Sequence, residues 1–423
     1  MTALIFGLAP AMAATRQDVN AALKITFLAR PRLSLSRFLV VAQVALSLLL
    51  LTGAGLFVRT LRNLRALDLG FAAESVLQFW IDPQASGYKQ EQLPDLYRQL
   101  LERLNSAPGI QSVSMAGHGF RSGSSSTCCI SVEGYTNRHD EDREIQTNSV
   151  TPGYFRTMGL RLLSGRDFTA QEAVGKPREF PKIAVINETM ARYYFGNDNP
   201  LGKRFGWGDP PQLKFDTEII GVAKDANYGN LRDKAPRLIY YPKQGGIYLV
   251  VRAAVPLAAM SATIRREIQT VDKNLEISDI SAIPQLRDQA LIQERLLAEL
   301  SGFFGLLALL LACIGLYGVM SYNVARRTHE IGVRMALGAQ RVDVVRLVMR
   351  ATMSLVVVGL IAGLGAALAT TRLIASLLYG LTPNDPLTIG LAGLLLVIVA
   401  ALAGYLPARR AARVDPMIAL RHE

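Results

Sequence analysis

Four runs of apolar residues stand out along the chain. They cover residues 38–58, 302–325, 352–371 and 388–406, and none contains a charged residue. Each is close to the ~20 residues that an α-helix needs to cross the hydrocarbon core of a membrane. Arginines flank the first run and follow the second directly. Buried helices of a soluble protein are the alternative, but run length and flanking arginines favour four transmembrane helices.

The polar stretch between the first two runs, residues 59–295, is too long for a loop and predicts a domain of its own. Short runs rich in β-forming residues predict strands at 76–80, 182–186, 218–222 and 248–252, and these runs alternate with helical patterns. Helical spacing predicts one helix over 93–104 and another from Pro256, with Leu257, Ile264, Ile268 and Val271 on one face. We therefore expect an α+β domain of mixed sheets, inserted after the first transmembrane helix.

Helical patterns also adjoin the membrane at both ends of this domain. Residues 59–67 continue the first span outward, and residues 283–300 lead into the second. We expect these segments to act as stalks that pass a membrane movement to the domain.

The positive charge of the chain is unevenly distributed. The net charge is +12, but the stretch 60–295 holds 29 basic and 27 acidic residues, so +10 lies elsewhere. Most of the basic residues outside it precede the first span, lie between the second and third, or follow the fourth, and Arg59 is a local exception. The positive-inside rule places the termini and residues 326–351 in the cytoplasm. The 59–295 domain then lies outside, which for a bacterial inner membrane means the periplasm. Because the positive charge marks the cytoplasmic segments, it does not indicate a nucleic-acid partner.

A search for catalytic chemistry finds no convincing site. The segment GNDNPLGKR at 196–204 has one residue too many between its glycines for a phosphate-binding loop, and Arg204 follows the lysine where Ser or Thr is needed. His118 with Ser114, Ser122 or Ser124 lacks the surroundings of a nucleophilic serine. We expect no catalytic residue and no cofactor bound by this chain.

Three residues invite a metal-site reading. Cys128, Cys129 and His139 match no common zinc spacing. A vicinal disulfide or two loop thiols is the plainer interpretation of the two cysteines, and we expect no metal.

Small and polar residues in the spans predict helix packing. Gln43 is the one strongly polar side chain of the first run, and a bond to a neighbouring helix is favoured over contact with a ligand. Gly359 and Gly363 form a GxxxG pair in the third run. This pair allows close helix contact, either within the chain or between two copies.

The segment 326–351 predicts an amphipathic helix at the cytoplasmic membrane face. Exposed charges at Glu330, Arg334 and Arg341 flank apolar residues at Ile331, Val333, Met335 and Leu337. Gly332 and Gly338 are expected to be bends or caps. Such a helix suits docking into a groove of another protein, or it lies on anionic lipid.

Several motifs resemble one family. EIGVRMALGA at 330–339 resembles the coupling segment of MacB/FtsX-type ABC transporter permeases, and PARRAARVDPMIALRHE at 407–423 resembles their C-terminal tail. Motifs at 150–168, 183–196, 199–205 and 218–228 resemble the MacB-type periplasmic core domain. The resemblance implies four transmembrane helices, a large periplasmic domain after the first, and a dimer that works with two ATPases, on which ATP is bound. It also assigns ATPase coupling to Glu330, Ile331, Gly332, Val333, Arg334, Met335 and Gly338.

The N-terminal residues repeat the C-terminal tail. Aligning Pro10 with Pro407 also places Arg16 on Arg413 and Asp18 on Asp415. A signal peptide is the alternative for residues 1–16, but no basic residue opens the chain. This repeat resembles the acidobacterial duplicated orphan permeases, in which two units are fused. Residues 1–37 would then be a cytoplasmic segment with the remnant of a preceding unit, and the chain would be the C-terminal half of such a protein.

These inferences divide the chain into segment 1–37, helix 38–58, periplasmic domain 59–295 and an FtsX-like permease domain 296–423. We expect a subunit that couples a separate ATPase to movement of the periplasmic domain and exports a drug, peptide, lipid or lipoprotein. The alternative is a non-transporting subunit that regulates a periplasmic enzyme or a sensor kinase. A stand-alone periplasmic enzyme is a third, weaker reading. Expected partners are the ATPase, a second permease unit, a periplasmic adaptor or enzyme, and membrane lipid.

Overall fold

A computed structural model describes residues 35–122, 125–128, 130–136, 144–174, 181–208, 213–229, 231–278, 280–373, 375–382 and 384–413. The N-terminal repeat, Cys129 and His139 lie outside these residues, as does the side chain of Cys128. The chain divides into two compact units. The first takes residues up to Gly53, Ser301–Leu373 and the residues from Pro383 onward, and the second takes Ala54–Leu300 and Ile374–Thr382.

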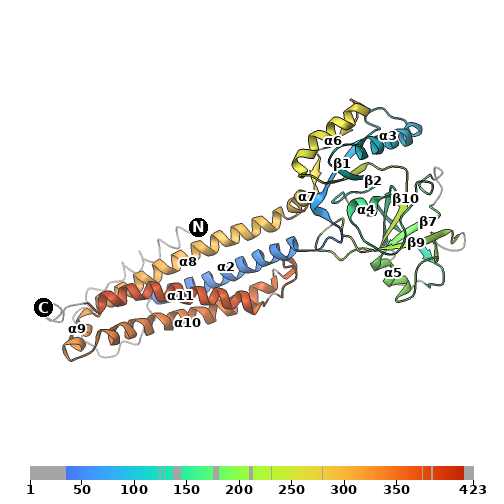
Figure 1. The fold of residues 1–423 in the computed structure, drawn as a ribbon. Coiled ribbons are helices and arrows are strands. Elements are labelled where there is room, and N and C mark those ends of the chain that lie inside the picture. The colour runs from blue at the N-terminus through green and yellow to red at the C-terminus, as the bar shows by residue number, and fades with distance from the viewer. Residues whose placement is uncertain are drawn as a thin grey trace. The chain divides into compact units, whose positions relative to one another are not determined.

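The first unit is a bundle built from four long helices (Figure 1). They are α2 (Leu35–Arg65), α8 (Ile292–Arg326), α10 (Arg341–Leu373) and α11 (Pro386–Ala411). All four are long and apolar enough to cross a membrane, which confirms the four predicted transmembrane helices. The bundle interior holds Val40 and Val44 of α2, Leu316 of α8, Val356 of α10, and Ala400 and Ala403 of α11.

The helices extend beyond the uncharged runs that predict them. The helix α10 begins at Arg341, well before residue 352. Its first turn is held by the backbone N–H of Gln340, which donates to Asp343 Oδ2 at 3.1 Å in the manner of a capping box. A helix extends to the residues that cap its ends, whether or not those residues are apolar. The length of an apolar run therefore underestimates the length of the helix.

The second unit contains a mixed sheet of thirteen strands among the described residues. The strands are β1 (Val76–Asp82), β2 (Ile110–Ala116), β3 (Ser125–Cys128), β4 (Ile130–Val132), β5 (Glu144–Val150), β6 (Leu162–Gly165), β7 (Ile183–Asn187), β8 (Arg204–Trp207), β9 (Thr217–Ala223), β10 (Leu238–Pro242), β11 (Tyr248–Ala253), β12 (Glu276–Ile277) and β13 (Ser281–Ala282). Their order is β12-β1-β11-β2-β5-β10-β7-β9-β8-β4, with β13 on β1, β3 on β5 and β6 on β9. The pairs β5/β10 and β7/β9 are parallel, and the others are antiparallel.

Helices cover this sheet and close three apolar cores. The helices are α3 (Leu93–Asn105), α4 (Tyr154–Met158), α5 (Glu188–Phe195), α6 (Leu257–Val271) and α7 (Ile283–Ala290), with 3-10 turns at Ala73–Ser75, Gln90–Gln92 and Ala375–Leu377. As Figure 1 shows, α3 and α6 lie together over β1 and β2. Leu100 of α3 and Ile264 of α6 are fully buried in that core, and Met190 of α5 anchors another. The α+β fold and the four predicted strands are therefore confirmed.

The first predicted stalk segment is helical as expected, because α2 continues the span outward to Arg65, where a turn follows. The second segment differs from its predicted form. The segment 283–300 is not one helix, because Leu291 separates α7 from α8. The N–H of Leu291 bonds to the carbonyl of Asp288, three residues earlier, and its side chain is buried in the central core of the unit. The regular helix is interrupted at the residue whose side chain is buried.

Candidate coupling surface

A short helix, α9 (Thr328–Ala336), follows α8 after a single junction residue. The Arg327 N–H still bonds to the carbonyls of Asn323 and Val324, which extends the end of α8. The Thr328 hydroxyl donates to the Ala325 carbonyl at 2.9 Å. The Ile331 N–H then bonds to the Arg327 carbonyl at 2.9 Å, so the new helix starts at once. This junction sets the direction in which the segment 326–351 leaves α8.

Glycine ends α9 by a specific mechanism. Gly338 has a φ of +99°, a conformation that residues with a side chain rarely adopt. The Ala339 N–H bonds to the Arg334 carbonyl at 3.0 Å, and the Gly338 N–H to the Met335 carbonyl at 3.1 Å. This pair of bonds is a Schellman motif, so Gly338 is a cap as expected. Gly332 lies inside the helix and is buried, so the prediction of a bend or cap there was wrong.

Ile331 anchors α9 to the helical bundle. Its side chain is 3% exposed and shares a core with Val344 of α10 and with Ala411 and Ala412 at the end of α11. Met335, one turn later, is partly buried against the same core. One apolar face of α9 therefore holds the ends of α10 and α11 together.

The opposite face of α9 is exposed. Glu330 and Arg334 form an ion pair at 2.6 Å with side chains about half exposed, and such an (i, i+4) pair contributes only about 0.3–0.5 kcal/mol to helix stability. Leu337 is 83% exposed, and Val342 at the start of α10 is 65% exposed. Val333 is half-buried. The surface thus presents two apolar side chains beside charged groups, which suits insertion into a groove of another protein.

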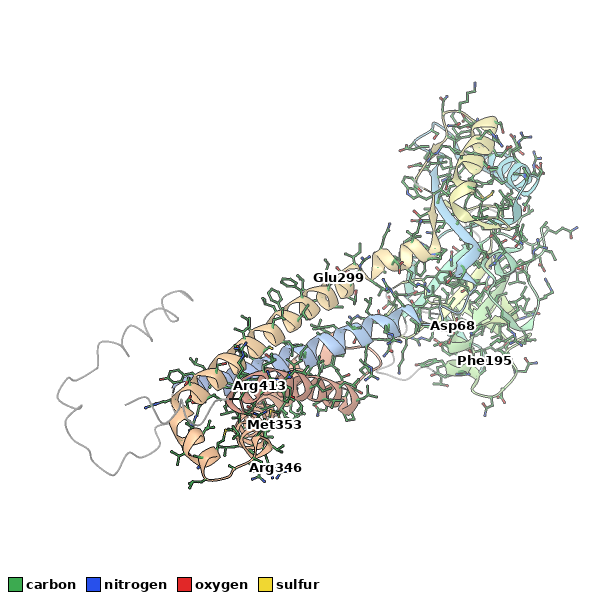
Figure 2. All side chains as sticks on the ribbon, turned by 60° about the vertical axis from the view of Figure 1, so that its left-hand side comes forward. Asp68, Phe195, Glu299, Arg346, Met353 and Arg413 are labelled. Atoms are coloured by element: carbon green, nitrogen blue, oxygen red, sulfur yellow. The ribbon has the colours of Figure 1, made fainter. Side chains whose placement is uncertain are left out.

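Arginines surround this surface. Figure 2 shows Arg346 on α10 and Arg413 after α11 at the end of the bundle where α9 lies. Both are exposed. Arg410 of α11 is exposed as well, and it donates to the Tyr317 hydroxyl of α8 at 2.7 Å.

The predicted packing residues lie at close approaches of α2 to its neighbours. A Cβ added to Gly359 would lie 2.8 Å from Val44 Cβ, and one added to Gly363 would lie 2.9 Å from Ala45 Cα. Only glycine fits at such distances, so the GxxxG face of α10 packs on α2 within the chain. On α8, a Cβ added to Gly315 would lie 2.6 Å from Gln43 Oε1. Gln43 therefore reaches across to a neighbouring helix.

One part of the second unit had no signal in the sequence. The loop Ile374–Thr382 groups with the periplasmic domain rather than with the membrane bundle. Asn63 near the end of α2 donates its amide to the Tyr379 carbonyl at 3.3 Å, and the Tyr379 N–H points to Thr60 Oγ1 at 3.5 Å. These contacts join residues more than 300 positions apart, and no local pattern could have found them.

The residues weighed for catalysis have structural surroundings where the structure describes them. Ser114 is fully buried within β2, and the Ser122 hydroxyl donates to the Gly119 carbonyl at 2.9 Å. Burial lowers the pKa of His118, whose backbone N–H and C=O both bond to the Asn148 side chain. Within the described residues no three His, Cys, Asp or Glu side chains gather as a metal site would require.

Two family models match this chain. The MacB-like periplasmic core domain covers residues 38–272, more than half of the chain, and the FtsX-like permease C-terminal domain covers residues 302–416. The chain belongs to the MacB/FtsX-type ABC permeases. It is accordingly a multi-pass membrane protein with a large periplasmic domain between its first and second transmembrane helices. Neither matched model is a nucleotide-binding domain.

Relatives share about a quarter of their aligned residues with this chain. The macrolide export ATP-binding/permease protein MacB of Mannheimia succiniciproducens is 27% identical over 64% of this chain and 42% of its own length. The uncharacterized ABC transporter permease YknZ of Bacillus subtilis is 25% identical over 67% of this chain and 72% of its own. The periplasmic region of MacB from Actinobacillus actinomycetemcomitans is a solved structure with a TM-score of 0.34 and 18% identity, covering 55% of this chain and 97% of that one. The chain thus spans less than half the length of the MacB relative.

Proposed function

We propose that the chain is the permease subunit of an ABC transporter, coupling ATP hydrolysis on a separate ATPase to movement of its periplasmic domain. The observation that carries the proposal is the two-sided burial of α9. Ile331 is 3% exposed and holds the helix to the bundle, whereas Leu337 is 83% exposed. A force applied to the exposed side therefore reaches α10 and α11 through packed side chains, which transmit displacement because protein interiors are nearly incompressible.

The two long helices at the domain border continue this path. The helices α2 and α8 each begin in one unit and end in the other. Each helix is a hydrogen-bonded rod. Tilting either rod in the membrane moves its outer end. We infer that ATPase closure pushes α9, tilts the spans and displaces the domain. A second permease unit would supply the other half of the assembly.

Polar groups inside the spans serve the bundle itself. The Ser47 hydroxyl donates to the Gln43 carbonyl and to the Ala308 carbonyl of α8, and Thr352 bonds to the Val348 carbonyl. None of these described contacts involves a charged residue, whereas a hydrophilic channel would be lined by charged residues. This supports mechanical transmission, with the cargo a drug, peptide, lipid or lipoprotein taken up on the outer side.

A charge reversal at Glu330 tests the coupling role. In membranes that also hold the partner ATPase, Glu330→Lys should abolish the stimulation of ATP hydrolysis by the permease without reducing its insertion. Glu299→Lys makes the same charge change near the other end of α8 and should leave stimulation intact. If Glu330→Lys stimulates ATP hydrolysis as much as the unaltered chain does, the coupling role is refuted.

Glu330→Lys also breaks the ion pair with Arg334. The double variant Glu330→Lys with Arg334→Glu restores a pair with reversed signs. If it recovers full stimulation, Glu330 acts through the helix and not on the ATPase.

A regulatory subunit that moves no cargo shares the same coupling and is distinguished by its partners. Purification from membranes should bring along an ATPase in either case. A periplasmic adaptor would identify export, and a periplasmic hydrolase or a sensor kinase would identify regulation.

A further inference from the structure

A pocket of about 400 Å³ lies inside the second unit, beside the residue that separates α7 from α8. Its size falls within the range of small-molecule sites. Leu64 of α2, Leu231 and Leu291 give it an apolar lining, and Arg121, Arg232 and Glu294 bring charge to it. Neither the coupling mechanism nor the family match accounts for this mixture of apolar and charged groups.

Glu294 offers the pocket an unused acceptor. Its Oε1 accepts hydrogen bonds from Arg232 Nε at 3.2 Å and Nη2 at 3.0 Å. Both side chains are largely buried, at 15% and 24% exposure. Glu294 Oε2 is also buried and has no hydrogen-bond partner within the described part of the chain. A buried carboxylate oxygen without a donor is unfavourable, so the site favours a ligand that carries an N–H or O–H group.

Arg121 offers the pocket an unpaired positive charge. Among the described residues it is the one non-glycine with a positive φ, at +66°. That conformation is sparsely populated by residues with side chains and persists only where the surroundings impose it. Its N–H bonds to the Tyr228 carbonyl at 2.7 Å, and its guanidinium makes one bond, to the Leu286 carbonyl at 3.3 Å. No carboxylate of the described chain pairs with it, and a guanidinium suits a phosphate.

The pocket lies close to the expected membrane surface. Along α2, Leu64 is roughly 9 Å beyond Val58, where the first uncharged run ends, at 1.5 Å per residue. Along α8, Glu294 lies roughly 12 Å before Gly302 by the same measure. The headgroups add about 5–8 Å to each side of the hydrocarbon core, so these two pocket residues lie just beyond the headgroup layer.

The charges select among ligands. A bare phosphate would meet the Glu294 carboxylate, and a bare ammonium would meet two arginines. A ligand that carries both groups a few atoms apart satisfies both ends of the pocket. We propose that this pocket binds a phosphoethanolamine-type zwitterion, with the ammonium donating to Glu294 Oε2 and the phosphate on Arg121. The part of the ligand next to the phosphate packs against Leu64, Leu231 and Leu291. The proposal does not depend on the ATPase-coupling role.

Native mass spectrometry of the full chain in detergent tests the proposal with three short-chain lipids. Phosphatidylethanolamine should bind at least about tenfold more tightly than phosphatidylcholine, whose ammonium has no N–H to donate, because a charge-assisted hydrogen bond is lost. Phosphatidylglycerol, which lacks the ammonium, should also bind more weakly. Soluble glycerophosphoethanolamine is the second probe. If it competes, the headgroup alone is sufficient; if it does not, the bound form is the membrane lipid.

Two substitutions separate the two ends of the pocket. Glu294→Gln should lower phosphatidylethanolamine affinity about tenfold and erase its advantage over phosphatidylcholine. Arg121→Gln should weaken both lipids, because both carry the phosphate. The matched controls are Glu299→Gln, on α8 as labelled in Figure 2, and Arg98→Gln, an exposed arginine of α3. Both should bind like the unaltered chain.

The proposal is overturned if the two lipids bind equally, or if neither pocket variant changes the affinity. It is also overturned if the controls lose as much affinity as the pocket variants. Thermal unfolding of each variant shows whether it is folded. Arg121 is exposed, so Arg121→Gln still decides the question if Glu294→Gln fails to fold.

Discussion

Replacing Ile331 with alanine should detach α9 from the bundle while the transmembrane helices stay folded. Ile331 is 3% exposed and is the most buried apolar side chain that α9 contributes to its contact with α10 and α11. Removing a buried isoleucine side chain down to Cβ costs about 2–5 kcal/mol. Because α9 is short and lies at the end of the bundle, this cost falls on local opening rather than global unfolding. About 3 kcal/mol raises the detached population roughly 100-fold.

Leu337 provides the matched comparison. It is 83% exposed, so Leu337→Ala removes little packing within the chain. Amide hydrogen exchange of the peptide 328–340 in the full-length protein should accelerate in Ile331→Ala and stay unchanged in Leu337→Ala. Stimulation of the partner ATPase should fall in both, in the first because the helix is no longer held and in the second because its contact with the ATPase is lost.

Two results would refute this reasoning. Unchanged exchange in Ile331→Ala would show that α9 is held by contacts other than the Ile331 side chain. Full stimulation in Leu337→Ala together with slow exchange would show that the exposed tip does not meet the ATPase.

Two further predictions follow from contacts and charges elsewhere. Gly359→Ile should lower the thermal unfolding midpoint in detergent, because its Cβ would lie 2.8 Å from Val44 Cβ and overpacking costs about 1–3 kcal/mol; Gly365→Ile, where nothing lies within 4 Å, should not, and equal shifts in the two would contradict the packing of α10 on α2. The hydrogen bonds from Arg166 lower the pKa of Glu172 to about 2, from 4.5. Its stabilising effect is therefore complete above pH 4.5 and is lost as the pH falls through 2. The difference in unfolding midpoint between the unaltered chain and Glu172→Gln should shrink over that interval, and a constant difference would count against the ion pair.

Local patterns were sufficient for the four spans and for four of the thirteen described strands of this protein. A span needs only a sufficiently long uncharged run, because no water is available inside a bilayer to pair the backbone. The strand at 76–80 is visible because it is a short run of mostly apolar residues, rich in β-branched and aromatic types. Gly338 is predictable as a cap because a left-handed residue after a helix is usually glycine. Each of these signals lies within about one turn or one strand.

Registers and partners required the tertiary structure. The sequence shows that α9 has apolar residues, but Ile331 is buried and Leu337 exposed only because α10 and α11 cover one side of the helix. The GxxxG pair allows close packing and does not name its partner, which is α2. The break at Leu291 arises because its side chain is drawn into the core of the second unit, against the helical preference of its neighbours.

The sequence by itself determined the membrane topology, the α+β class of the inserted domain and the family, since these depend on composition, periodicity and short motifs. Only the tertiary structure decided which face of α9 is free, where loop Ile374–Thr382 belongs, and that Arg121 and Glu294 share a pocket. Arg121 and Glu294 are more than 170 positions apart in the sequence. Their proximity depends on the non-local strand pairings of the sheet, and such pairings leave no periodic trace in the chain.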